Sequence, residues 1–289
     1  MTAPSPSDGR VLHHEAVSAE TEPGRWMYVL HGIYGAGRNW RTVARRLARR
    51  RPGWGALLVD LRMHGESTGF EGPHTLSACA ADLRRLAEAT GRPPSALLGH
   101  SFGGKVVLQA LESAEVAGTE GETGGPDAPD RQAWIVDSTP EAREPEGSAV
   151  RMLEVVRGLS GPFDDRKEAV RGIVDEGFPR PVAQWMATNL ERADDGFRWA
   201  LDWSAMEELL EDFFATDLWP VVADPPPGWE IHFVKAENSE VLPAGACDRI
   251  RRAGRRTGRV FLHRLSGGHF LNAENPDAVV DLLAEELPE

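Results

Sequence analysis

The stretch that decides the fold is Ala96-Leu97-Leu98-Gly99-His100-Ser101-Phe102-Gly103-Gly104-Lys105, which contains the pattern G-x-S-x-G. An apolar run precedes the pattern, and a helical pattern over residues 105–111 follows it. In this context the pattern predicts a tight strand-to-helix turn that exposes Ser101 at the helix N-terminus, near the positive end of the helix dipole. Glycine at positions 99 and 103 removes side chains that would collide across such a turn. We therefore predict that Ser101 is a nucleophile.

A serine nucleophile requires a general base, because its hydroxyl is a weak nucleophile at neutral pH. His269 lies in Ser266-Gly267-Gly268-His269-Phe270, directly after the last apolar run at residues 260–265. The two glycines would let this loop bring the imidazole over the edge of a sheet. We predict His269 as the base, and interpret four other histidines as ordinary surface residues: His13, His14, His74 and His263.

The acid that orients the base has two candidate positions. The turn after the apolar run 231–235 holds Ser239 when it is aligned on Pro243, and a serine cannot stabilise an imidazolium as a carboxylate does. Asp137 ends the run 134–137, which follows the nucleophile helix. We therefore predict Asp137 as the acid and Ser239 as an accessory residue, with two glutamates of the later turn as the alternatives: Glu237 and Glu240.

Acyl transfer also needs two hydrogen-bond donors aimed at the developing oxyanion. The backbone N–H of Phe102 is one candidate. The second should come from His31-Gly32-Ile33-Tyr34-Gly35, because its glycines let the backbone turn toward Ser101. We predict the Ile33 N–H, with the Tyr34 N–H as the alternative.

A charged segment, Asp60-Leu61-Arg62-Met63-His64-Gly65-Glu66-Ser67, follows the next apolar run. Its composition predicts a polar turn that is fixed by side-chain hydrogen bonds. We interpret the segment as structural, and an approach of His64 to the substrate pocket remains the alternative.

Short apolar runs alternate with amphipathic helical patterns along the chain, which is typical of a mostly parallel sheet covered by helices. One such helix places Trp40, Val43, Ala44 and Leu47 on a single face. Seven arginines between Arg38 and Arg51 fit the solvated face of that helix better than an anion site. The predicted strands cover residues 26–30, 56–61, 95–98, 134–137, 231–235 and 260–265.

The strand pattern disappears between about residues 141 and 227, which predicts an inserted all-helical cap or lid on a core formed by residues 1–140 and 228–289. Helical patterns cover residues 150–159, 166–176, 181–192 and 204–214. Most aromatic residues of this segment are expected to pack the cap onto the core. A different segment, 117–130, is rich in glycine and acidic residues, has no basic residue and predicts a flexible surface loop.

The composition of the 289 residues, 41% hydrophobic and 27% charged, is that of a soluble globular protein. A net charge of -13 argues against nucleic acid or a stable membrane association and favours a small-molecule partner. The two cysteines, Cys79 and Cys247, support neither a disulfide framework nor a thiolate metal site. Residues 1–10 lack a signal-peptide pattern, so we expect a cytoplasmic protein.

Together these segments resemble the α/β-hydrolase superfamily, and within it the YbfF-like esterases and their mitochondrial abhydrolase-domain relatives. The motif blocks at residues 31–35, 60–67, 99–105 and 137–140 follow the same order, and Thr188-Asn189-Leu190 with Gly196-Phe197-Arg198-Trp199 resembles the lid signature of that group. The resemblance implies an acid after the strand that follows the nucleophile helix and a serine in the later turn, which Asp137 and Ser239 match. Ser138-Thr139 departs from the group, where an apolar residue and then serine is common, and so does the acidic loop.

The leading functional prediction is a carboxylic ester hydrolase or thioesterase that forms an acyl-enzyme on Ser101 and needs no cofactor. One alternative is a non-hydrolytic enzyme with the same triad, such as a lyase or a cofactor-free haloperoxidase. Another is a ligand-binding protein that has retained a hydrolase pocket. Dehalogenase and epoxide hydrolase activities are disfavoured, because those enzymes use an aspartate where this chain has Ser101.

Overall fold

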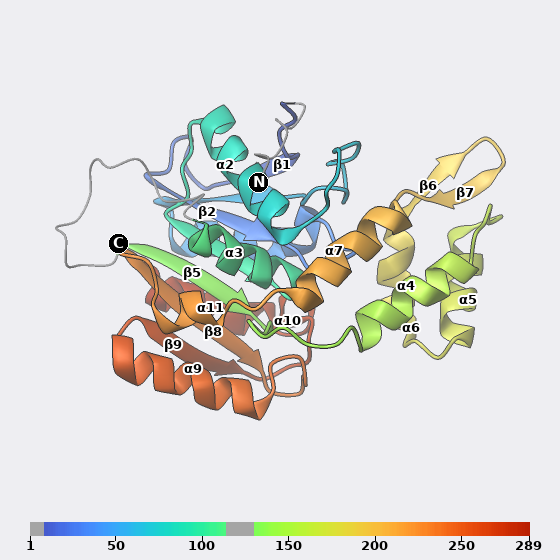
Figure 1. Ribbon diagram of the computed structural model, residues 1–289. Coiled ribbons are helices and arrows are strands. Elements are labelled where there is room, and N and C mark those ends of the chain that lie inside the picture. The colour runs from blue at the N-terminus through green and yellow to red at the C-terminus, as the bar shows by residue number, and fades with distance from the viewer. Residues whose placement is uncertain (1–8, 114–129) are drawn as a thin grey trace.

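A seven-stranded sheet in the order β1-β3-β2-β4-β5-β8-β9 runs through the core of the computed structural model, which describes residues 9–113 and 130–289 (Figure 1). Neighbouring strands run parallel except β1, which pairs antiparallel with β3. The predicted loop 117–130 lies outside the described residues except for Asp130. The strands are β1 (His14–Val17), β2 (Arg25–Leu30), β3 (Trp54–Val59), β4 (Ala96–His100), β5 (Arg131–Val136), β8 (Trp229–Ala236) and β9 (Val260–Leu265).

Six of these strands correspond to the six predicted from apolar runs, so the prediction of a mostly parallel sheet is confirmed. Strand β9 has the predicted bounds, and the others differ by a few residues at their ends. Strand β1 was not predicted, because its four residues, His14-Glu15-Ala16-Val17, form no apolar run. An edge strand pairs with a neighbour on a single side, so it needs little apolar surface.

Two helical layers cover the sheet, because side chains alternate between its faces along each strand. Tyr28 and Leu30 of β2 pack in one apolar cluster, whereas Met27 and Val29 pack in the other. The first face is covered by α2 (Leu76–Thr90), α3 (Phe102–Glu112), α8 (Trp219–Ala223) and α9 (Ala244–Thr257), and the second by α1 (Arg41–Arg50), α10 (Leu271–Glu274) and α11 (Pro276–Glu286).

Helix α1 buries Val43, Ala44 and Leu47 as the sequence predicts. Three of its arginines form ion pairs with carboxylates of β1 and α11: Arg41 with Glu15, Arg46 with Asp277 and Arg50 with Asp281. These pairs agree with the interpretation of the arginine-rich face as a solvated helix surface.

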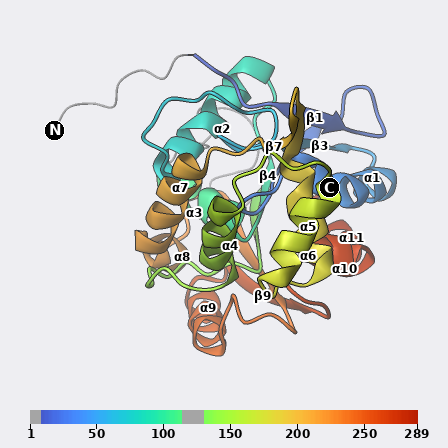
Figure 2. The ribbon, with the colours of Figure 1, turned by 90° about the vertical axis from the view of Figure 1, so that its right-hand side faces the viewer.

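Between β5 and β8 the chain forms a group of elements beyond the carboxyl ends of the strands, toward which the arrow of β5 points (Figure 1). In the view of Figure 2 the helices of this group lie in front of the core. The group comprises α4 (Ser148–Gly158), α5 (Arg166–Asp175), α6 (Arg180–Met186), a 3-10 helix at Ala187–Asn189, β6 (Leu190–Ala193), β7 (Gly196–Trp199) and α7 (Trp203–Ala215), with α8 after them.

The expectation that this segment is entirely helical is wrong. The helix predicted over residues 181–192 ends at Met186, and β6 and β7 form an antiparallel hairpin in which Ala193 pairs with Gly196. Asp194 and Asp195 form the two-residue connection, and Gly196 follows with φ of 137°. Acidic residues before a glycine are a hairpin signal that outweighs the weak helical periodicity here.

Lys105 of helix α3 forms hydrogen bonds near both ends of the inserted segment. Its fully buried Nζ donates hydrogen bonds to the carbonyl oxygens of Glu141 at 2.7 Å, Phe213 at 2.5 Å and Thr216 at 2.8 Å. Burial lowers the pKa of Lys105 to about 8. The lysine thus joins the point where the chain leaves the core to the end of α7, where the chain returns.

Both cysteines are free thiols, as the sequence predicts, and both are buried. Within residues 9–113 and 130–289, no helix combines the length and the apolar character that crossing a membrane requires.

Candidate active site

Ser101 occupies the predicted turn between β4 and α3. Its backbone angles, φ of 52° and ψ of -116°, are strained for a residue with a Cβ, at a cost of about 1–3 kcal/mol. The turn closes tightly, since a Cβ at position 99 would lie 2.1 Å from the carbonyl oxygen of Gly103. A Cβ at position 103 would lie 2.6 Å from the carbonyl oxygen of His31. Glycine at position 99 thus allows the turn that presents Ser101 to close, and glycine at position 103 allows α3 to approach the His31 backbone.

Asp137 and His269 are hydrogen-bonded, with 2.7 Å between His269 Nδ1 and Asp137 Oδ2. Asp137 follows β5 directly and is fully buried, whereas the His269 side chain is 25% exposed. The other carboxylate oxygen, Oδ1, accepts a hydrogen bond from the Ala236 N–H at 3.2 Å. Nε2 is therefore the ring nitrogen of His269 that is not bonded to Asp137.

The electrostatic environment keeps Asp137 ionised. Burial alone would raise the pKa of Asp137, but hydrogen bonds from His269, the Ser239 hydroxyl and the Ala236 N–H outweigh it and lower that pKa below its ordinary value. Ser239 is also buried and its Oγ accepts from the Val241 N–H at 3.2 Å. Ser239 therefore lies where an accessory residue is expected, as a partner of the carboxylate.

The two alternative acids, Glu237 and Glu240, are both exposed. The ring nitrogen that they would have to bind, His269 Nδ1, is hydrogen-bonded to Asp137. The structure therefore brings Asp137 and His269 together and leaves both glutamates outside the pair.

The loop predicted to supply an oxyanion donor, residues 31–35, borders the same cavity as Ser101. Its turn is closed by a hydrogen bond from the Gly35 N–H to the Gly32 carbonyl at 3.0 Å, and Tyr34 has φ of 62°. Ile33 and Tyr34 both line the cavity, so the choice between their N–H groups stays a prediction. Phe102 is the first residue of α3, where a backbone N–H has no acceptor within the helix.

Two buried side chains that the sequence analysis did not single out hold these loops. Asn189, from the inserted segment, donates from Nδ2 to the Tyr34 carbonyl at 2.8 Å. His100 donates from Nε2 to the His269 carbonyl at 2.8 Å. No signal of spacing marks either residue, because their partners lie 155 and 169 positions away.

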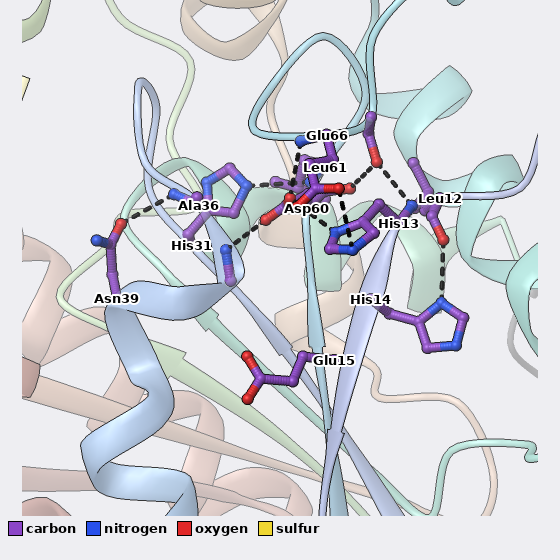
Figure 3. A network of polar contacts seen from close by, with 12 residues as sticks. Leu12, His13, His14, Glu15, His31, Ala36, Asn39, Asp60, Leu61 and Glu66 are labelled. Carbon is purple, nitrogen blue, oxygen red and sulfur yellow. Dashed lines mark hydrogen bonds and ion pairs between the residues drawn. The ribbon is translucent and has the colours of Figure 1, made fainter. Parts of the chain in front are cut away.

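Asp60 connects the polar turn that follows β3 to the 3-10 helix Gly37–Trp40, which comes shortly after the loop 31–35 (Figure 3). Its Oδ1 accepts from the Gly37 N–H at 2.7 Å, and its Oδ2 accepts from the Glu66 N–H at 2.9 Å and from His13 Nδ1 at 3.0 Å. Burial raises the pKa of Asp60, but these hydrogen bonds lower it below its ordinary value overall. The predicted polar turn, fixed by side-chain hydrogen bonds, is thus present and supports the loop.

The alternative that His64 approaches the pocket is not supported. His64 is fully buried, and the residues that line the cavity do not include it. Its Nδ1 bonds to the Arg62 carbonyl at 2.9 Å. The interpretation of His74 as a surface histidine is wrong, since only 8% of the residue is exposed. His263 is partly buried, and its ring stacks on that of His232 with centroids 5.3 Å apart.

We expect His64 to make the stability of the protein sensitive to acid. Burial lowers the pKa of His64 to about 3, and the nearby His31 lowers it too. The unfolded chain protonates this imidazole near pH 6.5, so below that pH the unfolded state binds more protons and the free energy of unfolding falls as the pH falls. Between pH 7 and pH 5 the wild type should lose about 2 kcal/mol more than His64→Leu. Urea unfolding at both pH values measures this difference, and equal losses would contradict the prediction.

Ser101 and His269 open into one cavity of about 320 Å³. Five apolar residues of its wall come from the inserted segment and from the residue after His269: Met152, Phe178, Val182, Trp185 and Phe270. Three other aromatics of that segment are buried in the core packing, as expected: Phe213, Phe214 and Trp219. The cavity can therefore hold an apolar group next to Ser101 and His269.

Comparison with known proteins agrees with the fold. The sequence model of the alpha/beta hydrolase family matches residues 27–282. The chain is 25% identical over 269 residues to the sn-1-specific diacylglycerol lipase ABHD11 of Mus musculus, a match that covers 88% of this chain and 80% of the lipase. It is also 29% identical over 120 residues to the 2-succinyl-6-hydroxy-2,4-cyclohexadiene-1-carboxylate synthase of Serratia proteamaculans (strain 568), which covers 39% of this chain and 45% of the synthase.

Among solved structures, a marine microorganism esterase superposes with a TM-score of 0.75 and 21% sequence identity, covering 95% of this chain and 98% of the esterase. This likeness concerns the fold. The family match extends over most of the chain and confirms the resemblance that the motifs indicate. The chain therefore belongs to the alpha/beta hydrolase family.

Proposed function

We propose that the protein is a serine hydrolase that cleaves a small-molecule ester or thioester through an acyl-enzyme on Ser101. The observation that carries the proposal is the 2.7 Å hydrogen bond between His269 Nδ1 and Asp137 Oδ2, next to the cavity that Ser101 and His269 share. Membership of a hydrolase family supports it, as does the match to a lipase over 88% of the chain.

The proposed mechanism assigns each residue one role. With Nδ1–H donated to Asp137, Nε2 of His269 takes the proton from the Ser101 hydroxyl as its oxygen attacks the carbonyl carbon of the substrate. The Phe102 and Ile33 N–H groups stabilise the tetrahedral oxyanion. His269 then gives the proton to the leaving alcohol or thiol. Water, activated by His269, attacks the acyl-enzyme and releases the acid.

We further propose that residues 141–227 form a cap domain over a core of residues 1–140 and 228–289. Support comes from the cavity wall, to which α4 contributes Met152 and α6 contributes Val182 and Trp185. The hydrogen bond of Lys105 to the Glu141 carbonyl supports the start of the segment, and its hydrogen bond to the Thr216 carbonyl lies eleven residues before the proposed end. A cap in this position would select the acyl group. The cytoplasmic location stays a prediction.

A second candidate is a non-hydrolytic reaction with the same triad, and the partial match to a synthase favours it. A burst of nitrophenol from p-nitrophenyl acetate that depends on Ser101 distinguishes the two, because acyl-enzyme formation releases the phenol before water completes the turnover. A ligand-binding protein with a retained pocket would release none.

A fluorophosphonate probe tests the proposed nucleophile. The wild type should be labelled at Ser101 alone, since only an activated serine attacks phosphorus readily. Labelling is measured by mass spectrometry of peptides, with Ser148→Ala as the matched control, because Ser148 lines the same cavity. The control should label like the wild type. Labelling that survives in Ser101→Ala would assign the reactivity to another serine and refute the proposal.

A further inference from the structure

A concave basic groove of about 780 Å³ lies on the surface between the inserted segment and the core. We define the basic groove by the five cationic residues that line it: Arg38, Arg166, Lys167, Arg171 and Arg180. The rest of its lining contains no carboxylate. Since the whole chain has a net charge of -13, five positive charges around one hollow are a strong local excess.

The charges of the basic groove are available to a ligand. Among the described residues, no ion pair joins any of the five cations to a carboxylate. Other surface arginines differ, since Arg157 pairs with Glu207 and Arg198 pairs with Asp195. Arg38 is exposed like the other arginines between Arg38 and Arg51 that the sequence predicts on a solvated surface, but it also lines the groove.

One of the arginines, Arg166, is held in place before any ligand arrives. It donates from Nη1 to the Ala187 carbonyl at 2.5 Å, and its guanidinium lies over the Phe197 ring, 5.2 Å from the centroid. A guanidinium fixed in this way loses less side-chain entropy when it binds an anion. Arg38 extends from the core toward the Thr188 carbonyl, with Nη2 at 3.5 Å, and its side chain is exposed.

The basic groove adjoins the catalytic cavity, because two elements line both. Helix α6 contributes Val182 and Trp185 to the cavity and Arg180 and Gln184 to the groove. The 3-10 helix at Gly37–Trp40 contributes Asn39 and Trp40 to the cavity and Arg38 to the groove. Figure 2 shows α5 and α6 on the same side of the molecule as α1, which follows that 3-10 helix. Arg180 and Gln184 lie on nearly the opposite face of α6 from Val182 and Trp185, so the two sites are neighbours on either side of this helix. A long leaving group would have to extend around α6 to contact both.

We propose that the basic groove binds phosphate groups on the leaving group of the substrate, so that the enzyme acts on acyl esters or thioesters of phosphorylated alcohols or thiols. The proposal rests on the proposed hydrolase function, because it places the acyl group in the apolar cavity beside Ser101.

Phosphate is the anion that suits this site. A phosphate monoester has a charge of about -1.5 to -2 and three acceptor oxygens, and guanidinium groups bind such oxygens in bidentate fashion. Four of the five cations of the groove are arginines. A flat anionic membrane is a poorer match, because the groove is concave and the net charge of -13 opposes approach to such a surface.

Two substrates that share the thioester test the proposal. Butyryl-coenzyme A carries phosphate groups and an adenosine, whereas butyryl-pantetheine has neither, so the groove variant and the salt dependence are needed to assign a difference to the phosphates. The groove variant is the double substitution Lys167→Gln and Arg171→Gln, two exposed side chains of α5. Its control is Arg252→Gln with Arg255→Gln on α9, which makes the same change of charge on a helix that does not line the groove.

The wild type should hydrolyse butyryl-coenzyme A with the lower KM. The groove variant should raise that KM about tenfold with kcat retained, and its KM for butyryl-pantetheine should not change. The control variant should match the wild type on both substrates. Raising NaCl from about 0.05 M to about 0.5 M should reduce the preference of the wild type, since salt screens exposed charges. Equal KM values of the wild type for the two thioesters, or equal losses in both double variants, would overturn the proposal.

Binding measured without turnover separates failure of this inference from failure of the proposed function. Ser101→Ala should bind coenzyme A more tightly than pantetheine in calorimetry, and the groove substitutions in that background should weaken only the former. That result supports the groove even if no ester is hydrolysed. Equal binding of both compounds, or binding of phosphatidylglycerol vesicles without binding of coenzyme A, would refute the proposed phosphate site. The proposed role of Ser101 is tested separately, by the hydrolysis of p-nitrophenyl butyrate.

Discussion

Ser101→Ala should abolish ester hydrolysis, with kcat falling by on the order of 10⁶. The substitution removes the oxygen that forms the acyl-enzyme and leaves the oxyanion donors in place, so only their weak residual catalysis remains. Alanine keeps a Cβ at φ of 52°, so the backbone strain at the turn does not change. The hydrolysis of p-nitrophenyl butyrate by the two proteins measures the loss.

Folding and specificity need separate controls. The urea midpoint of Ser101→Ala should match that of the wild type, which excludes unfolding as the cause of the loss. Ser148→Ala removes a hydroxyl from the same cavity and should change kcat less than about tenfold. If Ser101→Ala keeps a tenth of the wild-type kcat, Ser101 is not the nucleophile.

The sequence predicts those parts of the site that depend on contacts between neighbouring residues. The turn at Ser101 needs glycine at two fixed positions, and both lie within two residues of the serine. Buried parallel strands appear as continuous apolar runs, which is why β4, buried along its whole length, could be predicted. The residue after each such strand lies at the carboxyl end of the sheet, which is why Asp137 could be predicted at the site.

Contacts between distant segments were not predictable. His100 is the variable residue of G-x-S-x-G, and nothing in that pattern indicates that its imidazole would reach the carbonyl of His269. Asn189 stands in a block similar to a lid signature, but its hydrogen bond to Tyr34 depends on how the inserted segment packs on the core. The basic groove likewise combines Arg38 with residues more than a hundred positions later.

Asp137→Asn should lower kcat by on the order of 10³ to 10⁴. The amide would favour the wrong tautomer of His269, and it would remove the negative charge that stabilises the imidazolium. Asparagine tolerates positive φ as aspartate does, so the backbone at φ of 46° should persist. The Ala236 N–H can still bond to the amide oxygen. The loss should therefore appear in kcat for one ester at pH 8, with the urea midpoint as the folding control.

The later turn should contribute far less. Ser239→Ala removes a hydroxyl that donates to the ionised Asp137 carboxylate, a hydrogen bond expected to contribute about 1.5 to 3 kcal/mol, so kcat should fall by roughly ten- to a hundredfold. Glu237→Gln and Glu240→Gln alter exposed side chains and should have smaller effects still. These magnitudes differ enough from that of Asp137→Asn to identify the acid. A larger loss in either glutamate variant than in Asp137→Asn would move the acid to the later turn, and Ser101 and His269 would keep their roles.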